Sequence, residues 1–126
     1  MKIKDIKFKA KRLDNGEWII GSFVVMKIPA LSKTTIGIVA AGGATLHEVD
    51  PSTVCQFTGL KDCKGKELFE NDLIHFVGHK PIGKVLWSEE DYAFMVASGN
   101  EPLYWLSEVM EIGKIAIVGN KFDKEK

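Results

Sequence analysis

Apolar and polar residues alternate in short runs along this chain, and turn-forming residues separate the runs. In the opening run three apolar residues alternate with three lysines: Ile6, Lys7, Phe8, Lys9, Ala10 and Lys11. A period of two residues is that of a β-strand with one buried and one solvated face. Many short strands with little helical periodicity favour an antiparallel barrel or roll. We therefore expect a mainly β fold with at most one short helix.

The first half of the chain predicts two β-hairpins. Asp14-Asn15-Gly16 accepts positive φ easily, so it should turn the first strand into an antiparallel partner that ends at Pro29. Gly21 inside this partner predicts a bulge or a bend. Residues 34–49 should form the next hairpin, with Gly42-Gly43 at its tip.

Turn signals are denser in the second half. Turns are expected at Lys64-Gly65 and at Glu70-Asn71-Asp72, and residues 83–87 should pair with residues 92–97. Residues 103–110 are ambiguous, and the roughly helical spacing of their apolar side chains allows one short helix there. No linker or repeat divides the chain, and residues 1–126 are expected to form a single domain.

Charge and hydropathy exclude several classes of protein. The 126 residues contain 17 basic and 17 acidic side chains, so no net field attracts a polyanion. The charged N-terminus lacks the apolar core of a secretory signal. The longest charge-free run, residues 34–46, is interrupted by glycines and is shorter than the ~20 residues of a membrane-spanning helix. We expect a cytoplasmic protein that has no contact with membranes.

One long segment resembles a family signature. Residues 56–74 read QFTGLKDCKGKELFENDLI, and the YopX family pattern is Q-[YF]-T-G-L-x-D-x-N-G-K-x-[IL]-[YF]-E-G-D-[IV]-[IV]. Residues 6–10, 83–87 and 117–120 are similar to flanking strands of the same family. Two departures from the pattern matter for the backbone: Lys64 replaces Asn, and Asn71 replaces Gly. Asn tolerates left-handed φ better than other non-glycine residues, so the second turn can still adopt a positive φ at residue 71.

The resemblance implies a small SH3-like barrel or roll with additional β-hairpins, as one YopX-like domain of a phage or prophage protein. It implies no established enzymatic activity that could be transferred to named residues. We therefore expect a protein that is not an enzyme and that uses no cofactor.

The residues that could carry chemistry favour structural roles. His75 and His79 lie about 13 Å apart if the chain is extended, too far to share a metal ion without a fold-back of the loop. The carboxylates that could form an acid/base pair lie beside turns, where such side chains usually accept from backbone N–H groups: Asp62, Glu67, Glu70 and Asp72. Cys55 and Cys63 match no zinc or redox spacing, so reduced thiols are expected.

Two binding surfaces stay open as hypotheses. The first is a nucleic-acid face formed by four cations and one aromatic ring: Lys7, Lys9, Lys11, Arg12 and Trp18. The alternation of these lysines is also that of an ordinary solvated strand face, and edge lysines prevent unwanted pairing.

The tryptophans at 18, 87 and 105 could form a ligand cage, although core or half-buried packing is the commoner role.

The second surface is the uncharged segment of residues 34–46, which an isolated domain would have difficulty covering. It favours a protein-interaction or oligomerisation module, with a homo-oligomer as the expected assembly. Weak nucleic-acid binding through the lysine-rich first strand is the alternative.

Overall fold

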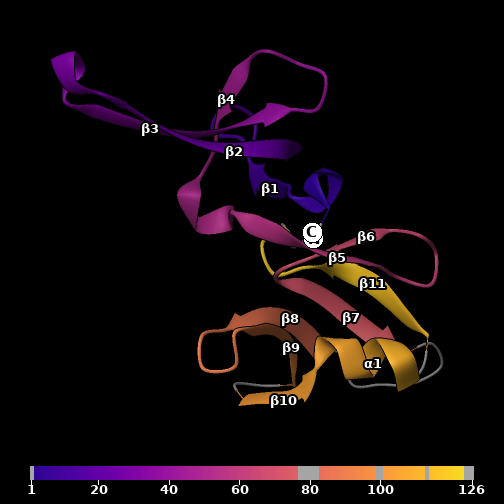
Figure 1. Cartoon of the computed structure of the whole chain (residues 1–126). Coiled ribbons are helices and arrows are strands. Elements are labelled where there is room, and N and C mark those ends of the chain that lie inside the picture. The colour runs from indigo at the N-terminus through magenta and orange to yellow at the C-terminus, as the bar shows by residue number, and fades with distance from the viewer. Residues whose placement is uncertain (1, 77–82, 99–100, 113, 124–126) are drawn as a thin grey trace. The chain divides into compact units, whose positions relative to one another are not determined.

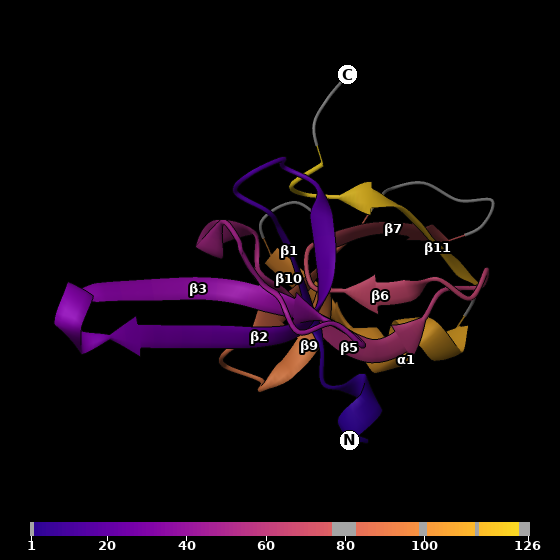
Figure 2. The same ribbon diagram turned by 90° about the horizontal axis from the view of Figure 1, so that it is seen from above.

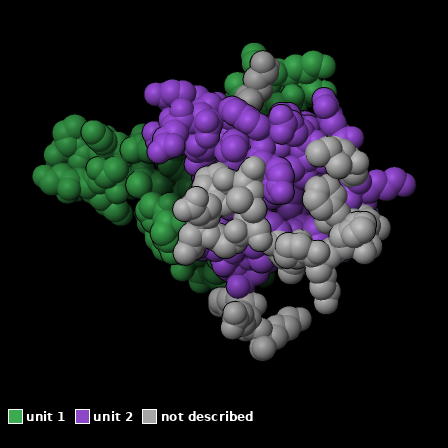
Figure 3. Space-filling view, turned by 90° about the horizontal axis from the view of Figure 1, so that it is seen from below, with its two compact units in different colours: residues 1–57 green, residues 58–126 purple. Residues whose placement is uncertain are grey.

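The computed structural model describes residues 2–76, 83–98, 101–112 and 114–123. The chain forms two compact units, residues 1–57 and residues 58–126, coloured separately in Figure 3. Each unit has its own antiparallel strands and its own hydrophobic core.

Unit 1 is an antiparallel sheet in the order β4-β3-β2-β1-β5 (Figure 1). Its strands are β1 (Phe8–Lys11), β2 (Trp18–Ile28), β3 (Lys33–Ala40), β4 (Leu46–Glu48) and the first part of β5 (Cys55–Lys61). Three single 3-10 turns accompany them: η1 (Ile3–Asp5), η2 (Pro29–Leu31) and η3 (Pro51–Thr53). Ala10, Ile38 and Val49 are fully buried, and half-buried apolar side chains pack around them.

The expected hairpins of the first half are confirmed. β1 pairs with β2 and β3 pairs with β4, both antiparallel. The turn residues Gly16 and Gly42 have φ of 70° and 77°, where a Cβ would be strained. η2 begins at Pro29, where β2 was expected to end.

The expected bulge at Gly21 is wrong. Neither ladder of β2 has a register shift: β1 pairs with β2 as far as Gly21, and β3 pairs with β2 from Gly21 onward. Gly21 is required for a different reason: a Cβ at this position would collide with the backbone carbonyl oxygen of Val39. A close approach of two backbones explains this glycine better than a bend does.

Unit 2 contains a second antiparallel sheet in the order β10-β9-β8-β7-β11. Its strands are β7 (Asp72–Phe76), β8 (Gly83–Ser88), β9 (Ala93–Ser98), β10 (Glu101–Trp105) and β11 (Ile115–Asn120). Strand β6 (Glu67–Phe69) lies beside the end of β5, and α1 (Leu106–Ile112) packs on β9 and β10. Buried side chains from strands and helix share one core: Leu68, Ile74, Val85, Val96, Leu106, Val109 and Ile115.

The mainly β class with one short α-helix is confirmed for the described residues. The sheets are not closed, so the SH3-like barrel that the resemblance implied is not confirmed. The helix begins at Leu106, after strand β10, because residues 101–105 pair with β9 instead of joining the helix. The pairing of residues 83–87 with residues 92–97 is confirmed, with Trp87 opposite Phe94.

Candidate functional site

The outer part of the β2–β3 hairpin forms a two-stranded arm. β1 pairs with β2 only as far as Gly21, and β4 pairs with β3 only from Gly37 onward, whereas β2 and β3 stay paired out to Ile28 and Lys33. Figures 1 and 2 show these two strands extending side by side beyond the rest of unit 1. We call residues 22–35 the β2–β3 arm. A two-stranded ribbon is marginally stable in water by itself, so such an arm gains stability from a partner.

Apolar side chains on the arm are exposed to solvent. Val25 and Met26 are 52% and 44% exposed, and Leu31 at the tip is 67% exposed. In contrast, Ile38 lies within the charge-free segment of residues 34–46 but is fully buried in the core. The structure thus corrects the expected location of the apolar surface: much of it comes from β2 and the tip, because the inner half of β3 packs on its own sheet.

The hydrogen-bond pattern identifies an open edge of β2. The Arg12 N–H donates to the Glu17 carbonyl at 2.9 Å, so this opposed pair is hydrogen-bonded, and every second pair along the ladder is likewise bonded. The same register directs the backbone groups of Ile19 and Gly21 toward β1. Further along, the N–H and C=O groups that point to this side belong to Phe23, Val25 and Lys27. No described strand pairs with them.

The lysines of the first strand are aligned on aromatic rings. Nζ of Lys9 lies 4.6 Å and Nζ of Lys11 lies 5.4 Å from the ring centroid of Trp18. Nζ of Lys7 lies 4.7 Å from the ring of Phe57, which is buried. Cations at this distance are attracted by the ring faces. The structure therefore brings together four of the five expected nucleic-acid residues on one face of β1 and β2.

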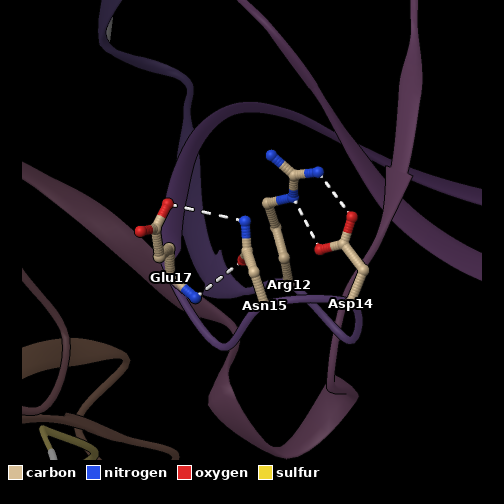
Figure 4. Close-up of polar contacts among 4 residues, drawn as sticks. All are labelled: Arg12, Asp14, Asn15 and Glu17. Carbon is tan, nitrogen blue, oxygen red and sulfur yellow. Dashed lines mark hydrogen bonds and ion pairs between the residues drawn. The ribbon is translucent and has the colours of Figure 1, made fainter.

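Arg12, the fifth residue, is engaged elsewhere (Figure 4). Its Nε donates to Oδ1 of Asp14 at 2.9 Å, and its guanidinium also contacts the other carboxylate oxygen. The hydrogen bond from Arg12 holds the pKa of Asp14 below its ordinary value. Asn15 makes a second local contact, accepting from the Glu17 N–H at 2.9 Å. Arg12 thus stabilises the β1–β2 turn and is already neutralised locally.

The signature segment uses its first aspartate as a backbone anchor. Asp62 is buried and accepts from the N–H groups of Lys64 and Lys66 at 2.9 and 2.8 Å, and from Ile117 N–H on β11 at 3.0 Å. Burial alone would raise its pKa, but these three amide donors together hold the pKa of Asp62 below its ordinary value. A carboxylate held in this way joins a tight turn to a distant strand.

The second aspartate closes the other end of the signature. Asp72 is buried, accepts from the Phe69 N–H at 2.7 Å and accepts from the side-chain amide of Asn120 at 2.8 Å. Asn71 has φ of 68°, and its own N–H and C=O bond to Val85 and Lys121. The signature sequence therefore fixes β6, β7 and β11 together. Sequence reasoning attributed these carboxylates to local turns and missed their long-range partners, because such partners become adjacent only on folding.

The candidate histidines, cysteines and tryptophans form no site within the described residues. His75 lies on β7, and His79 lies outside the described residues. Within the part of the chain that the structure describes, no group of three His, Cys, Asp or Glu side chains could hold a metal ion. Cys55 is buried, Cys63 is exposed, and no disulfide joins them. Trp87 and Trp105 are partly exposed and Trp18 is half-buried, so none of the three fills a core.

Two comparisons with known proteins complete the description. The family model described as YopX protein matches residues 7–125, which is nearly the whole chain. A search of curated proteins finds no match. Among the residues described, no helix is long and apolar enough to cross a membrane.

Proposed function

This chain belongs to the YopX family, and from that premise we propose that it is a non-enzymatic accessory protein of phages or prophages that acts through protein contacts. The β2–β3 arm is the surface that makes these contacts. The observation that carries the proposal is the conjunction of an open strand edge with exposed Val25, Met26 and Leu31 on one projecting element.

Three properties of the arm support this role. A long, exposed edge strand is a template for pairing with another chain, and proteins that avoid such pairing shorten, charge or cover the edge. Here the arm carries only two charged side chains, Lys27 and Lys33, over its whole length. Recognition by strand addition takes affinity from main-chain hydrogen bonds and specificity from alternate side chains, and this arm supplies both.

Affinity capture from cells that carry the phage or prophage tests the proposal. The parent chain is compared with Val25→Lys and with Val118→Lys, a control substitution on β11 at a valine that is 50% exposed. We expect Val25→Lys to lose the proteins that the parent retains, while Val118→Lys keeps them. Equal capture by all three chains would overturn the arm as the interaction surface.

A second candidate function is weak nucleic-acid binding, which the alignment of Lys7, Lys9 and Lys11 favours. Alternate residues along one strand present their cations in a row about 7 Å apart, a geometry that can follow an extended phosphate backbone. However, Lys9 and Lys11 already cover the Trp18 ring, so bases could stack there only after the lysines move aside. The equal numbers of acidic and basic residues also limit the attraction.

Fluorescence anisotropy with single- and double-stranded oligonucleotides measures this binding. We expect weak affinity that falls steeply with salt and that is lost when Lys9 and Lys11 are both replaced by Gln. The matched control replaces Lys64 and Lys66, two exposed lysines of unit 2. Sub-micromolar affinity at physiological salt would make nucleic-acid binding the leading function.

A further inference from the structure

We propose that the open edge of β2 is a self-pairing site, at which a second copy of this chain adds its own β2 antiparallel about a twofold axis at Val25. This inference rests on the proposed interaction role of the arm and names its partner. An antiparallel strand pair is self-complementary under a twofold axis, so a single edge can serve both copies.

The number of free backbone groups selects the position of the axis. The open edge presents the N–H and C=O groups of Phe23, Val25 and Lys27, spaced two residues apart. An axis at Val25 places Val25 opposite Val25 and Phe23 opposite Lys27, so all of these donors and acceptors are paired in both copies. An axis at Phe23 would instead bring Val25 opposite Gly21, which is already paired with β1.

Charge and proline exclude the registers displaced toward the tip. An axis at Lys27 would place two lysines directly opposite each other and would bring Pro29, which has no N–H, opposite Val25. In the register centred on Val25 the ammonium of Lys27 faces the ring of Phe23, a favourable cation–aromatic neighbour. The pairing therefore contains no like-charge contact.

The same register covers the exposed apolar side chains of β2. Val25 would meet Val25 of the second copy on one face of the joined sheet, and Val24 would meet Met26 on the other. Val25 and Met26 are 52% and 44% exposed in the single chain. The open edge of β3 is a poorer site, since β4 covers more of this strand and leaves a shorter edge free. The outer end of β3 also carries Lys33, whose Nζ lies 3.6 Å from Oε1 of Glu48.

Complementary charges at the axis test this arrangement. Val25→Lys and Val25→Glu each place like charges opposite each other, so each variant alone should remain at the 14.0 kDa chain mass in light scattering. Mixed in equal amounts, the two variants should form a heterodimer, because only a residue that faces its own counterpart is rescued by the opposite charge. Val118→Lys and Val118→Glu, at the matched exposed valine on β11, should each self-associate like the parent. Circular dichroism of every variant confirms that the fold is kept.

Amide hydrogen exchange at low and high protein concentration locates the edge. The N–H groups of Phe23, Val25 and Lys27 should gain protection as the concentration rises, while that of Thr34 on the β3 edge should not. A mixture that stays monomeric, or protection that appears at Thr34 alone, overturns the proposal. If the parent is a monomer but loses a captured protein partner on Val25→Lys substitution, self-pairing is wrong and the interaction role of the arm stands. If capture is also unchanged, both are wrong.

Discussion

At the scale of single residues, the signature segment holds unit 2 together through buried polar groups. Asp62 bonds to three backbone amides, one of them on β11, and Asp72 bonds to Phe69 and Asn120. Leaving a buried donor without an acceptor costs more folding free energy than an exposed hydrogen bond contributes. The identity of these residues is therefore explained by the fold, before any binding role is considered.

Asp62→Asn should destabilise the protein by about 1 to 3 kcal/mol at neutral pH, because the amide presents an N–H₂ group where three donors need acceptors. Folding lowers the pKa of Asp62 below 3.8, so its stabilisation is fully present above that value and is lost as pH falls through the folded pKa. Asn does not titrate. The difference in unfolding free energy between the parent and Asp62→Asn, measured by urea melts, should therefore become smaller as the pH is lowered. A difference that does not change with pH would contradict the role of the Asp62 carboxylate as a backbone anchor. The exposed Glu111→Gln is the control.

Asn71 tests the backbone requirement of the second turn. Since its φ is 68°, Asn71→Gly should change stability by less than about 1 kcal/mol, because relief of strain and greater unfolded entropy oppose each other. Asn71→Val forces a β-branched side chain into the left-handed region and should cost about 1 to 3 kcal/mol. Denaturant midpoints of both variants give the comparison. An unchanged midpoint for Asn71→Val would show that strain at this position is unimportant.

Residue patterns predicted this turn because the preference for Gly or Asn is local. They could not predict that Asp62 accepts a hydrogen bond from the Ile117 N–H, or that Lys9 and Lys11 both lie over the Trp18 ring. Both contacts depend on the register between separate strands. They also placed Arg12 on the cationic face, although Asp14, two residues away, binds it. Local competition between charges was visible in the sequence but was not weighed.

At the scale of elements, alternation and turn signals located the strands of the first two hairpins and the β8–β9 pairing. The short strand β6 and the strand β10 were missed. β6 has only three residues, and β10 contains Pro102, which argues against a strand except at an edge, where the structure places it. Gly21 was expected to mark a bulge or a bend, because the sequence alone cannot distinguish these from a close approach of two backbones.

Gly21→Ala should weaken unit 1 by about 1 to 3 kcal/mol, the usual cost of overpacking, because its Cβ would collide with the Val39 carbonyl. Gly43→Ala is a milder control, since its Cβ would lie 3.3 Å from the Ala40 carbonyl oxygen. Thermal unfolding of the two variants measures the difference. If Gly21→Ala melts at the parent temperature, β2 and β3 can move apart at this position without loss of stability. The close backbone approach would then not explain why glycine is needed here.

At the scale of the whole molecule, the chain has two units, and the family match spans both of them. The expectation of a single domain stays a prediction. The apolar surface that suggested association was expected in residues 34–46, but Ile38 of that segment is buried, whereas Val25 and Met26 on β2 and Leu31 at the tip of the arm are exposed. The sequence could not show this shift, because it depends on which strand of the hairpin packs on the core.

The native mass of the parent chain as a function of concentration is the most direct test of the interaction role. Light scattering after size exclusion should show a mass that rises from 14.0 kDa toward twice that value at tens of micromolar, while Val25→Lys stays at 14.0 kDa and Val118→Lys follows the parent. A parent chain that remains at 14.0 kDa throughout this range would contradict self-association through the β2–β3 arm.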